Sequence, residues 1–185
     1  MESSEVKHIG KFLEPDLVIS QIEIENGSQV ADFGCGPGYF AIPFGKAVGL
    51  RGHIYAFDIL PQALETVQGK AKSAGLVNIT TKRANLEKVG GSHLENEQLD
   101  WVIIKDILFQ NQQKDIIISE AFRVLKSGGR VLVIEWIDKD SNVGPDQEIR
   151  ISEEELCAMI EKQGFKIEKK LNSGDYHYAF IATKV

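Results

Sequence analysis

A glycine-rich segment early in the chain carries residue types that could bind a cofactor. Residues 30–40 read VADFGCGPGYF, so Gly34, Gly36 and Gly38 alternate directly after an apolar run. Because glycine has no Cβ atom, Gly34 and Gly36 can take positive φ and let the backbone press against a ligand, while Gly38 lets the next helix pack close to the strand. Asp32 adds a carboxylate that could attract a ligand ammonium group and would repel a pyrophosphate. The segment predicts a ligand-binding turn, with a turn of no ligand significance as the alternative.

The spacing of these glycines argues against a dinucleotide cofactor. A dinucleotide fingerprint, G-x-G-x-x-G, counted from Gly34 would require its third glycine where this chain has Tyr39. Pro37 also removes one N–H from the start of the helix, where a pyrophosphate would gather backbone donors. The turn therefore favours a phosphate-free cofactor, and an NAD-dependent enzyme remains an alternative.

A second acidic residue has the position expected for binding a sugar. Asp58 ends the apolar run IYAFD, where a carboxylate can accept hydrogen bonds from both ribose hydroxyls. Ile59 and Leu60 follow it and would offer an apolar wall to a purine. The alternative is that Asp58 caps a helix that begins near Pro61.

These residues need a framework of strands whose ends meet, and the rest of the chain predicts one. Short runs rich in β-branched residues are expected to form seven strands, over residues 29–33, 53–57, 78–83, 100–104, 130–135, 165–170 and 178–183. The run VLVI at 131–134 is apolar on both faces, which is typical of a parallel sheet covered by helices on both sides.

Apolar residues at helical spacing lie between these runs. Helices are expected over residues 61–74, over residues 113–126 with Gly128 and Gly129 as its end, and from a capping box at Ser152 and Glu155 to Gly164. Residues 138–150 are expected to form a surface loop. Alternating strands and helices predict a doubly wound α/β fold, whose ligand pocket lies beyond the carboxyl ends of the strands.

Length and composition limit the remaining possibilities. A chain of 185 residues that is 43% hydrophobic can bury one substantial core, so we expect one domain over residues 1–185. The formal net charge of -6 disfavours nucleic acid as a partner. The two cysteines have no metal-ligand spacing, so no metal site is expected, and they suit a reducing compartment. With no predicted membrane span or leader, a cytoplasmic location is expected; the oligomeric state is left open.

Four segments in order resemble one known family. VADFGCGPGYFAI with AFDILPQAL resembles motif I and the following acidic motif of class I S-adenosylmethionine-dependent methyltransferases, and LDWVIIKD and RVLKSGGRVLVIEW resemble that family's fourth and fifth strand segments. The resemblance covers nearly the whole chain, and within the class it is greatest to the small ubiquinone/menaquinone-biosynthesis-like, type 11 group. It implies a three-layer, Rossmann-like sheet of seven mainly parallel strands, in which the final strand, residues 178–183, is antiparallel and lies between its neighbours.

The resemblance also implies a set of residues that bind S-adenosyl-L-methionine. Gly34, Gly36 and Gly38 would line the methionine portion, Asp32 would lie near its amino group, and Asp58 would hold the ribose. The remaining members of the set come from the ends of later strands: Ile59 at the purine wall, Asn85 with Leu86 where the family often has Gly-Asp facing the adenine amine, and Lys105 where a backbone carbonyl commonly faces the cofactor.

The implied activity is methyl transfer to a small-molecule acceptor. Because a sulfonium methyl group is already electrophilic, transfer depends on in-line placement of the acceptor more than on a protein nucleophile, so no catalytic residue is assigned. If the acceptor must lose a proton, the candidate bases at strand ends are Asp106, Glu135 and His177, each of which could instead have a purely structural role. A protein or RNA methyltransferase and a non-catalytic cofactor-binding relative remain alternatives.

Aromatic side chains are available for the acceptor pocket. The candidates that could surround the acceptor are Tyr39, Phe109, Trp136, Tyr176 and Tyr178, with Phe12 and the N-terminal segment closing over it. The alternative for each of them is a place in the core or at the rim.

Overall fold

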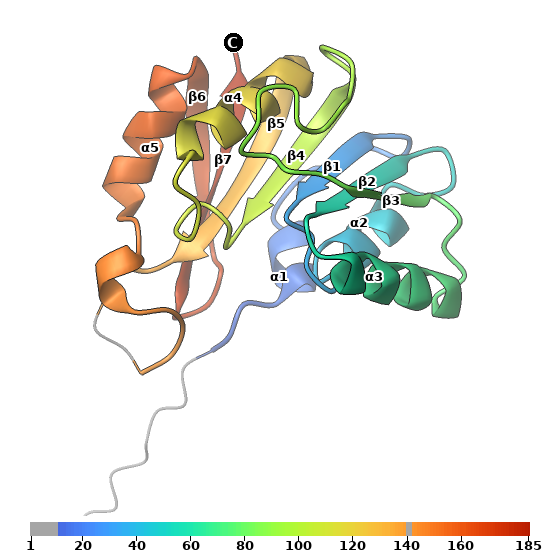
Figure 1. Cartoon of the computed structure of the whole chain (residues 1–185), viewed down its shortest axis with the longest axis horizontal. Coiled ribbons are helices and arrows are strands. Elements are labelled where there is room, and N and C mark those ends of the chain that lie inside the picture. Colours follow the sequence, from blue (N-terminus) through green and yellow to red (C-terminus); the bar gives the residue numbers. More distant parts are fainter. Residues whose placement is uncertain (1–10, 140–141) are drawn as a thin grey trace, which may run out of the picture.

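The computed structural model describes residues 11–139 and 142–185, and within them seven strands form one sheet (Figure 1). Their order across the sheet is β3-β2-β1-β4-β5-β7-β6. The strands are β1 Gln29–Phe33, β2 His53–Asp58, β3 Ile79–Arg83, β4 Leu99–Lys105, β5 Leu125–Trp136, β6 Phe165–Leu171 and β7 His177–Lys184. The helices are α1 Pro15–Ile19, α2 Ala41–Ala47, α3 Pro61–Ser73, α4 Lys114–Val124 and α5 Glu153–Lys162, with a 3-10 turn at Gln147–Ile149.

The first five strands run parallel, and the last two reverse direction. β1 pairs in parallel with β2 and β4, β2 with β3, and β4 with β5. β7 is antiparallel to both β5 and β6 and lies between them. The predicted doubly wound fold and the position of its final strand are therefore confirmed.

Helices cover both faces of the sheet, which gives three layers (Figure 1). The side chains of α1, α2 and α3 pack into one apolar cluster, and those of α4 and α5 pack into a second cluster on the other face. The strand β5 supplies both clusters, because Val131 and Val133 belong to one of them and Leu132 and Ile134 to the other. All four side chains are fully buried, as the apolar run predicted for a strand covered on two sides.

The predicted end of α4 is wrong. This helix ends at Val124 rather than Lys126, and β5 begins at Leu125, so the glycines at 128 and 129 lie inside a strand and do not end a helix. Leu125 is extended, with φ -73° and ψ 139°, and is fully buried where it pairs with Leu99. Pairing with β4 and burial within the sheet override the local helical pattern there.

The predicted surface loop between β5 and α5 is described at residues 138–139 and 142–150, where it is mostly exposed and contains the 3-10 turn. Its last residue, Arg150, is 9% exposed. The guanidinium of Arg150 donates to four backbone carbonyls, those of Ile137, Lys139, Val143 and Pro145. One buried side chain therefore holds both ends of the connection together.

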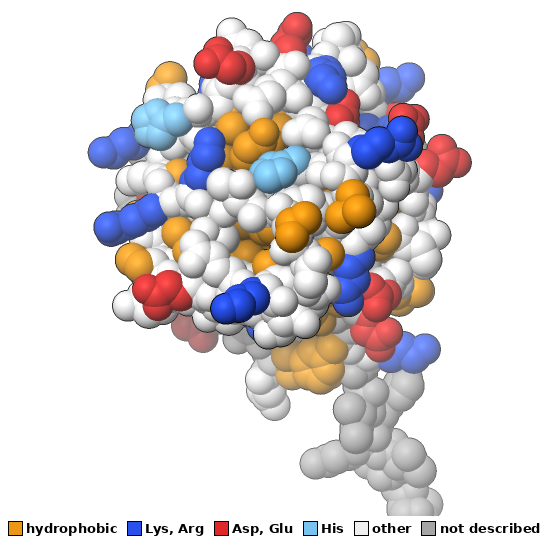
Figure 2. Space-filling model, turned by 90° about the vertical axis from the view of Figure 1, so that its right-hand side faces the viewer, with side chains coloured by type: hydrophobic (Ala, Val, Ile, Leu, Met, Phe, Trp, Pro, Cys, Tyr) orange, Lys and Arg blue, Asp and Glu red, His pale blue; other side chains and the backbone are white. Residues whose placement is uncertain are grey.

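Membrane-spanning helices and basic surface are the two features of the described residues that bear on possible partners. None of the helices within residues 11–139 and 142–185 is long and apolar enough to cross a membrane. On the face turned to the viewer in Figure 2, lysine and arginine side chains are scattered among acidic, apolar and uncharged ones. That face carries no continuous basic surface.

Candidate cofactor site

A cavity of about 480 Å³ lies where the parallel strands end. Its walls come from the turn after β1, the end of β2, the segment after β3 and the end of β4. Of the predicted cofactor residues, all but Gly38 line it: Asp32, Gly34, Gly36, Asp58, Ile59, Asn85, Leu86 and Lys105. The topology thus brings residues from four parts of the sequence to one place, which is where a doubly wound sheet binds its ligands.

The three glycines of the turn have different surroundings. A Cβ atom added at Gly36, where φ is +48°, would meet nothing within 4 Å. At Gly34, where φ is +74°, it would lie 2.3 Å from the Cγ2 atom of Ile107, and at Gly38 it would lie 3.1 Å from the Cγ2 atom of Val67 on α3. Gly36 therefore leaves open space, whereas Gly34 makes room for a protein side chain and Gly38 for a helix.

Asp58 connects the ends of β1 and β2. Its Oδ2 atom accepts a hydrogen bond from the Gly36 N–H at 2.9 Å, and its Oδ1 atom accepts one from the Leu60 N–H at 2.9 Å. Leu60, not Asp58, is the N-cap residue of α3, and its side chain makes no cap hydrogen bond. Asp58 therefore fixes the turn that follows β1 and does not cap a helix.

Asp32 is a buried acid with an oxygen that has no partner. The residue is 2% exposed, and its Oδ2 atom makes no hydrogen bond. Burial raises the pKa of Asp32 to about 7, although the Lys105 ammonium lowers it in part. A buried carboxylate oxygen without a partner is costly, and Asp32 is one of the residues that line the cavity.

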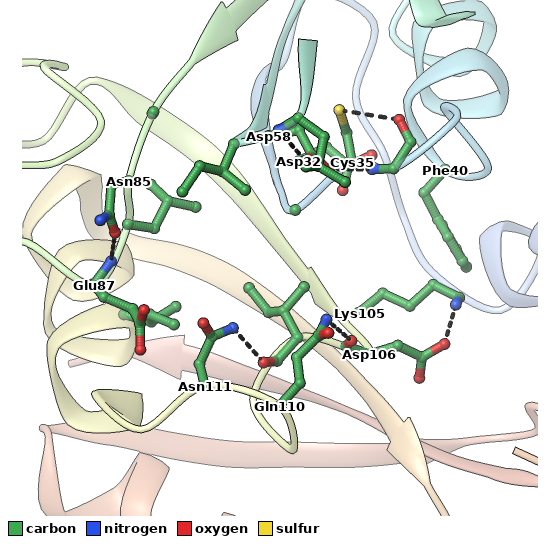
Figure 3. A pocket seen from close by; sticks show the side chains of 18 of the residues that line it. Asp32, Cys35, Phe40, Asp58, Asn85, Glu87, Lys105, Asp106, Gln110 and Asn111 are labelled. Carbon is green, nitrogen blue, oxygen red and sulfur yellow. Dashed lines mark hydrogen bonds and ion pairs between the residues drawn. The ribbon is translucent and has the colours of Figure 1, made fainter. Parts of the chain in front are cut away.

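The opposite end of the cavity is formed by the segment after β3. Asn85 accepts a hydrogen bond from the Glu87 N–H through Oδ1 at 3.0 Å, and Leu86 is buried behind it. Ile59 is exposed at the mouth. Figure 3 shows Asn85 and Glu87 on the side opposite Asp32 and Phe40.

The end of β4 adds charged groups. The Lys105 ammonium forms an ion pair with the Asp106 carboxylate and lies 5.6 Å from the centre of the Tyr39 ring. Figure 3 shows this pair below Phe40, with Gln110 and Asn111 beside it. Sequence reasoning did not include Phe40, Gln110 and Asn111 in the site, although the polar segment after the fourth predicted strand was a signal for the last two.

The three candidate bases, which the sequence offered separately, lie close together. Asp106 follows β4, Glu135 lies near the end of β5, and His177 begins β7. Because these strands are neighbours, the His177 Nε2 atom comes within 3.3 Å of the Asp106 carboxylate. Asp106 lines the cavity, while Glu135 is buried behind it.

Most of the predicted pocket aromatics lie elsewhere. Of the five, Tyr39 lines the cavity, and its hydroxyl donates to the Leu13 carbonyl at 2.5 Å. The buried Tyr178 hydroxyl donates to the Ile151 carbonyl. The remaining aromatic side chains also make their contacts outside the cavity. The Trp136 ring packs on His177, the Phe12 ring packs on Tyr176, and Phe109 packs against the core. Closure by residues 1–10 lies outside the described residues.

No metal is suggested by this part of the chain. Within the described residues, no group of three or more His, Cys, Asp or Glu side chains could hold a metal ion.

Comparison with known proteins gives a family and a fold. A family model described as a methyltransferase domain matches residues 24–180. The ubiquinone/menaquinone biosynthesis C-methyltransferase UbiE of Vibrio vulnificus is 33% identical over 111 residues, which cover 60% of this chain and 42% of that protein. The match therefore spans less than half the length of this relative.

Solved structures share the fold. An S-adenosylmethionine-dependent methyltransferase from Aquifex aeolicus has a TM-score of 0.85 at 23% identity, covering 94% of this chain and 91% of the other. A similar enzyme from Methanosarcina mazei has a TM-score of 0.71 at 18% identity, covering 90% of this chain and 97% of the other. At these identities the likeness establishes the architecture alone.

Proposed function

The chain belongs to the class I S-adenosylmethionine-dependent methyltransferase family, and from that premise we propose that it transfers a methyl group from S-adenosyl-L-methionine to a small-molecule acceptor. One observation carries the proposal more than any other: Asp32, a buried acid whose Oδ2 atom has no partner, lines the same cavity as Gly36, where an added Cβ atom would meet open space. A cofactor with an ammonium group and no phosphate fits both the Asp32 carboxylate and the open space at Gly36. We take residues 1–185 to act as one methyltransferase domain, and the two free thiols suit a cytoplasmic location.

The lining residues fit the two ends of this cofactor. Asp32 would accept from the methionine ammonium, and the turn at Gly34 and Gly36 would lie along the methionine chain. Asp58 would accept from the ribose hydroxyls, because each carboxylate oxygen that now accepts one backbone N–H keeps a second lone pair. Gly38 would act indirectly, by letting α3 pack close to the turn.

The nucleoside end would use the segments after β2 and β3. Ile59 and the buried Leu86 would contact the two faces of the purine, and the Asn85 carbonyl oxygen would accept from the adenine amine. The Lys105 backbone carbonyl would face the cofactor at the end of β4.

When bound, the cofactor supplies an electrophilic methyl group on a sulfonium. The chain's contribution is then to place the two reactants, since a correctly oriented acceptor removes much of the entropic barrier. Tyr39, Phe40 and Ile107 give the cavity apolar walls that limit water, and the buried Asp32 anchors the methionine end.

The acceptor is proposed to be small. A cavity of about 480 Å³ is within the range of small-molecule sites. The scattered charges in Figure 2 do not favour a polyanion as the acceptor. The name of the UbiE relatives suggests carbon as the methylated atom. Carbon-13 NMR of a product made from methyl-labelled cofactor would distinguish a C–CH3 group from N–CH3, O–CH3 or S–CH3.

Titration calorimetry with S-adenosylhomocysteine tests the cofactor assignment. We expect one site per chain, and we expect Asp58→Ala to weaken binding by about 1.5–3 kcal/mol, because charged hydrogen bonds are lost. Asp115→Ala, which removes an exposed acid on α4, is the matched control and should leave affinity unchanged. Binding of NADH without binding of S-adenosylhomocysteine would overturn the proposal.

A further inference from the structure

The end of the cavity near β4 carries three titratable groups from three adjacent strands. Asp106 directly follows β4, Glu135 belongs to β5 and His177 is the first residue of β7. β5 lies between the other two strands, and its Trp136 pairs in register with His177. The antiparallel insertion of β7 is what brings the imidazole to the carboxyl end of the parallel strands.

The Asp106 carboxylate lies between a cation and an imidazole. It forms an ion pair with the Lys105 ammonium, and both of its oxygens lie 3.3 Å from the His177 Nε2 atom. The Asp106 side chain is 17% exposed and lines the cavity, whereas the His177 side chain is 5% exposed and lies behind it. A ligand in the cavity could therefore contact Asp106 and would reach His177 only through it.

The surroundings of His177 hold its ring in place. The ring packs on Trp136 with 4.1 Å between centres, and its Nδ1 atom has no hydrogen-bond partner. Glu135 accepts from the Leu108 N–H at 2.7 Å, while its Oε2 atom has no partner. Burial, helped by the Asp106 carboxylate, raises the pKa of Glu135 to about 8. Glu135 therefore keeps its proton to a higher pH than an ordinary carboxyl group does.

This arrangement lowers the stability of the folded protein. Partly satisfied polar groups in a buried cluster cost stability. Asp106 also has φ +52°, a left-handed backbone conformation that a non-glycine residue rarely adopts. Such strain and such clusters concentrate at functional sites.

We propose that Asp106 and His177 act together as the proton acceptor of the methyl-transfer reaction, with Asp106 as the catalytic residue that contacts the acceptor and His177 as the positioning residue behind it. The inference rests on the proposed function and adds a substrate class: acceptors that lose a proton on methylation. The neighbouring charged or titratable groups are Lys105 on β4, Glu135 on β5 and, beyond Lys105, Asp32 on β1. The Arg150 guanidinium lies 6.0 Å from the centre of the Trp136 ring.

In the proposed step, the proton of the acceptor's X–H bond passes to the Asp106–His177 pair, and the electron pair of that bond forms the new X–CH3 bond. The S–CH3 bond breaks with its electron pair remaining on sulfur, which becomes a neutral thioether. Lys105 would stabilise the negative charge that develops on the acceptor.

Transfer of tritium from methyl-labelled S-adenosylmethionine tests the step with acceptors of two kinds. Phenol and 2-mercaptoethanol lose a proton on methylation, whereas pyridine and dimethyl sulfide do not. We expect Asp106→Asn to slow transfer to the first kind by at least 100-fold, as loss of a general base does, and to change transfer to the second kind less than threefold. Its affinity for S-adenosylhomocysteine and the transfer rate of the control Asp115→Asn should stay within threefold of the wild type.

Tryptophan fluorescence tests the pair without any acceptor. In a Trp101→Phe background Trp136 is the remaining tryptophan of the chain, and protonation of His177 places a cation against it and quenches its emission. We expect a pH-dependent transition that His177→Gln abolishes and that Asp106→Asn alters, because the Asp106 carboxylate lies 3.3 Å from the His177 Nε2 atom. His53→Gln, a histidine on the far side of β1, should leave the transition unchanged.

The outcomes separate this inference from the proposed function. The inference is overturned if Asp106→Asn slows methyl transfer to both kinds of acceptor equally, or if it leaves the fluorescence transition unchanged. In either case the proposed methyltransferase function is unaffected. If no acceptor of either kind is methylated, the proposed function fails, and the fluorescence titration alone then decides whether the two residues share a proton.

Discussion

Asp32 shows how a residue can lower the stability of the fold and still serve binding. Its carboxyl group is buried, has an oxygen without a partner and has its pKa raised to about 7. Free protein near neutral pH therefore holds this group partly protonated, although a ligand ammonium requires the charged form. Binding and proton release should be linked.

Affinity for S-adenosylhomocysteine should therefore fall as pH is lowered through 7. With the Asp32 pKa near 7, the charged fraction falls about tenfold between pH 8 and pH 6, and the dissociation constant should rise by about the same factor. Asp32→Asn should bind weakly at both pH values, with little change between them. A wild-type dissociation constant that is constant from pH 6 to pH 8 would contradict the role given to Asp32.

At the scale of single elements, the turn between β1 and α2 combines two kinds of glycine. Gly36 faces open space, whereas Gly34 lies against Ile107 and Gly38 against Val67. Only at Gly36 would an added side chain enter open space. The other two let the segment after β4 and the helix α3 approach the turn.

A pair of substitutions separates ligand space from backbone strain. Gly36 and Gly90 both have positive φ, at +48° and +70°, and neither has an atom within 4 Å of an added Cβ. Gly36→Val and Gly90→Val should each lower the free energy of unfolding by about 1–2 kcal/mol, the cost of left-handed backbone. Calorimetry should show at least a 100-fold loss of S-adenosylhomocysteine affinity for Gly36→Val alone. Equal affinities of the two variants would place the ligand elsewhere.

The strands and helices were largely predictable, because the spacing of apolar residues along the sequence reflects which side chains are buried. The predicted strand of residues 29–33 is confirmed as β1, and the doubly apolar run at 131–134 is confirmed as a central strand. The end of α4 was not predictable, since Leu125 joins β5 through pairing with a residue far away in sequence. The contact of Gly34 with Ile107 is equally non-local, so the sequence could not show that a protein side chain fills the space beside the Cα atom of Gly34.

For the site, the sequence identified the residues near the cavity better than their contacts. Asp32, Gly36 and Asp58 lie close together because the carboxyl ends of parallel strands meet at the same end of the sheet. Their predicted roles in binding stay predictions. Asp106 and His177 were separate candidates, because only the order of the strands reveals that they are 3.3 Å apart. The same order places Trp136 and Tyr178 away from the cavity.

At the scale of the whole molecule, buried acids should give the stability an unusual dependence on pH. The pKa values of Asp32 and Glu135 are raised by burial from 3.8 and 4.5 to about 7 and about 8. Between about pH 4 and pH 8 the folded protein therefore holds protons that the unfolded chain has released. Their stabilising contribution is complete below the unfolded pKa values and is lost as pH rises through the folded ones.

Denaturant titrations at two pH values measure this effect. The wild type should have a lower free energy of unfolding at pH 8.5 than at pH 6, by an amount on the order of 2 kcal/mol from these two groups. The double variant Asp32→Asn/Glu135→Gln should lose most of that difference. A difference of the same size in the double variant would show that other groups cause it.

Mapping of backbone amide chemical shifts during titration with S-adenosylhomocysteine shows whether the cofactor binds where the parallel strands end. A second cavity at the opposite ends of the strands, lined by Gly27, Trp101 and Gly128, serves as an internal reference. We expect the largest shifts at Gly34, Gly36, Asp58 and Asn85, with little change in the second cavity. Shifts that cluster around Gly128, or saturable binding that leaves the Gly36 and Asp58 resonances unmoved, would contradict this binding site.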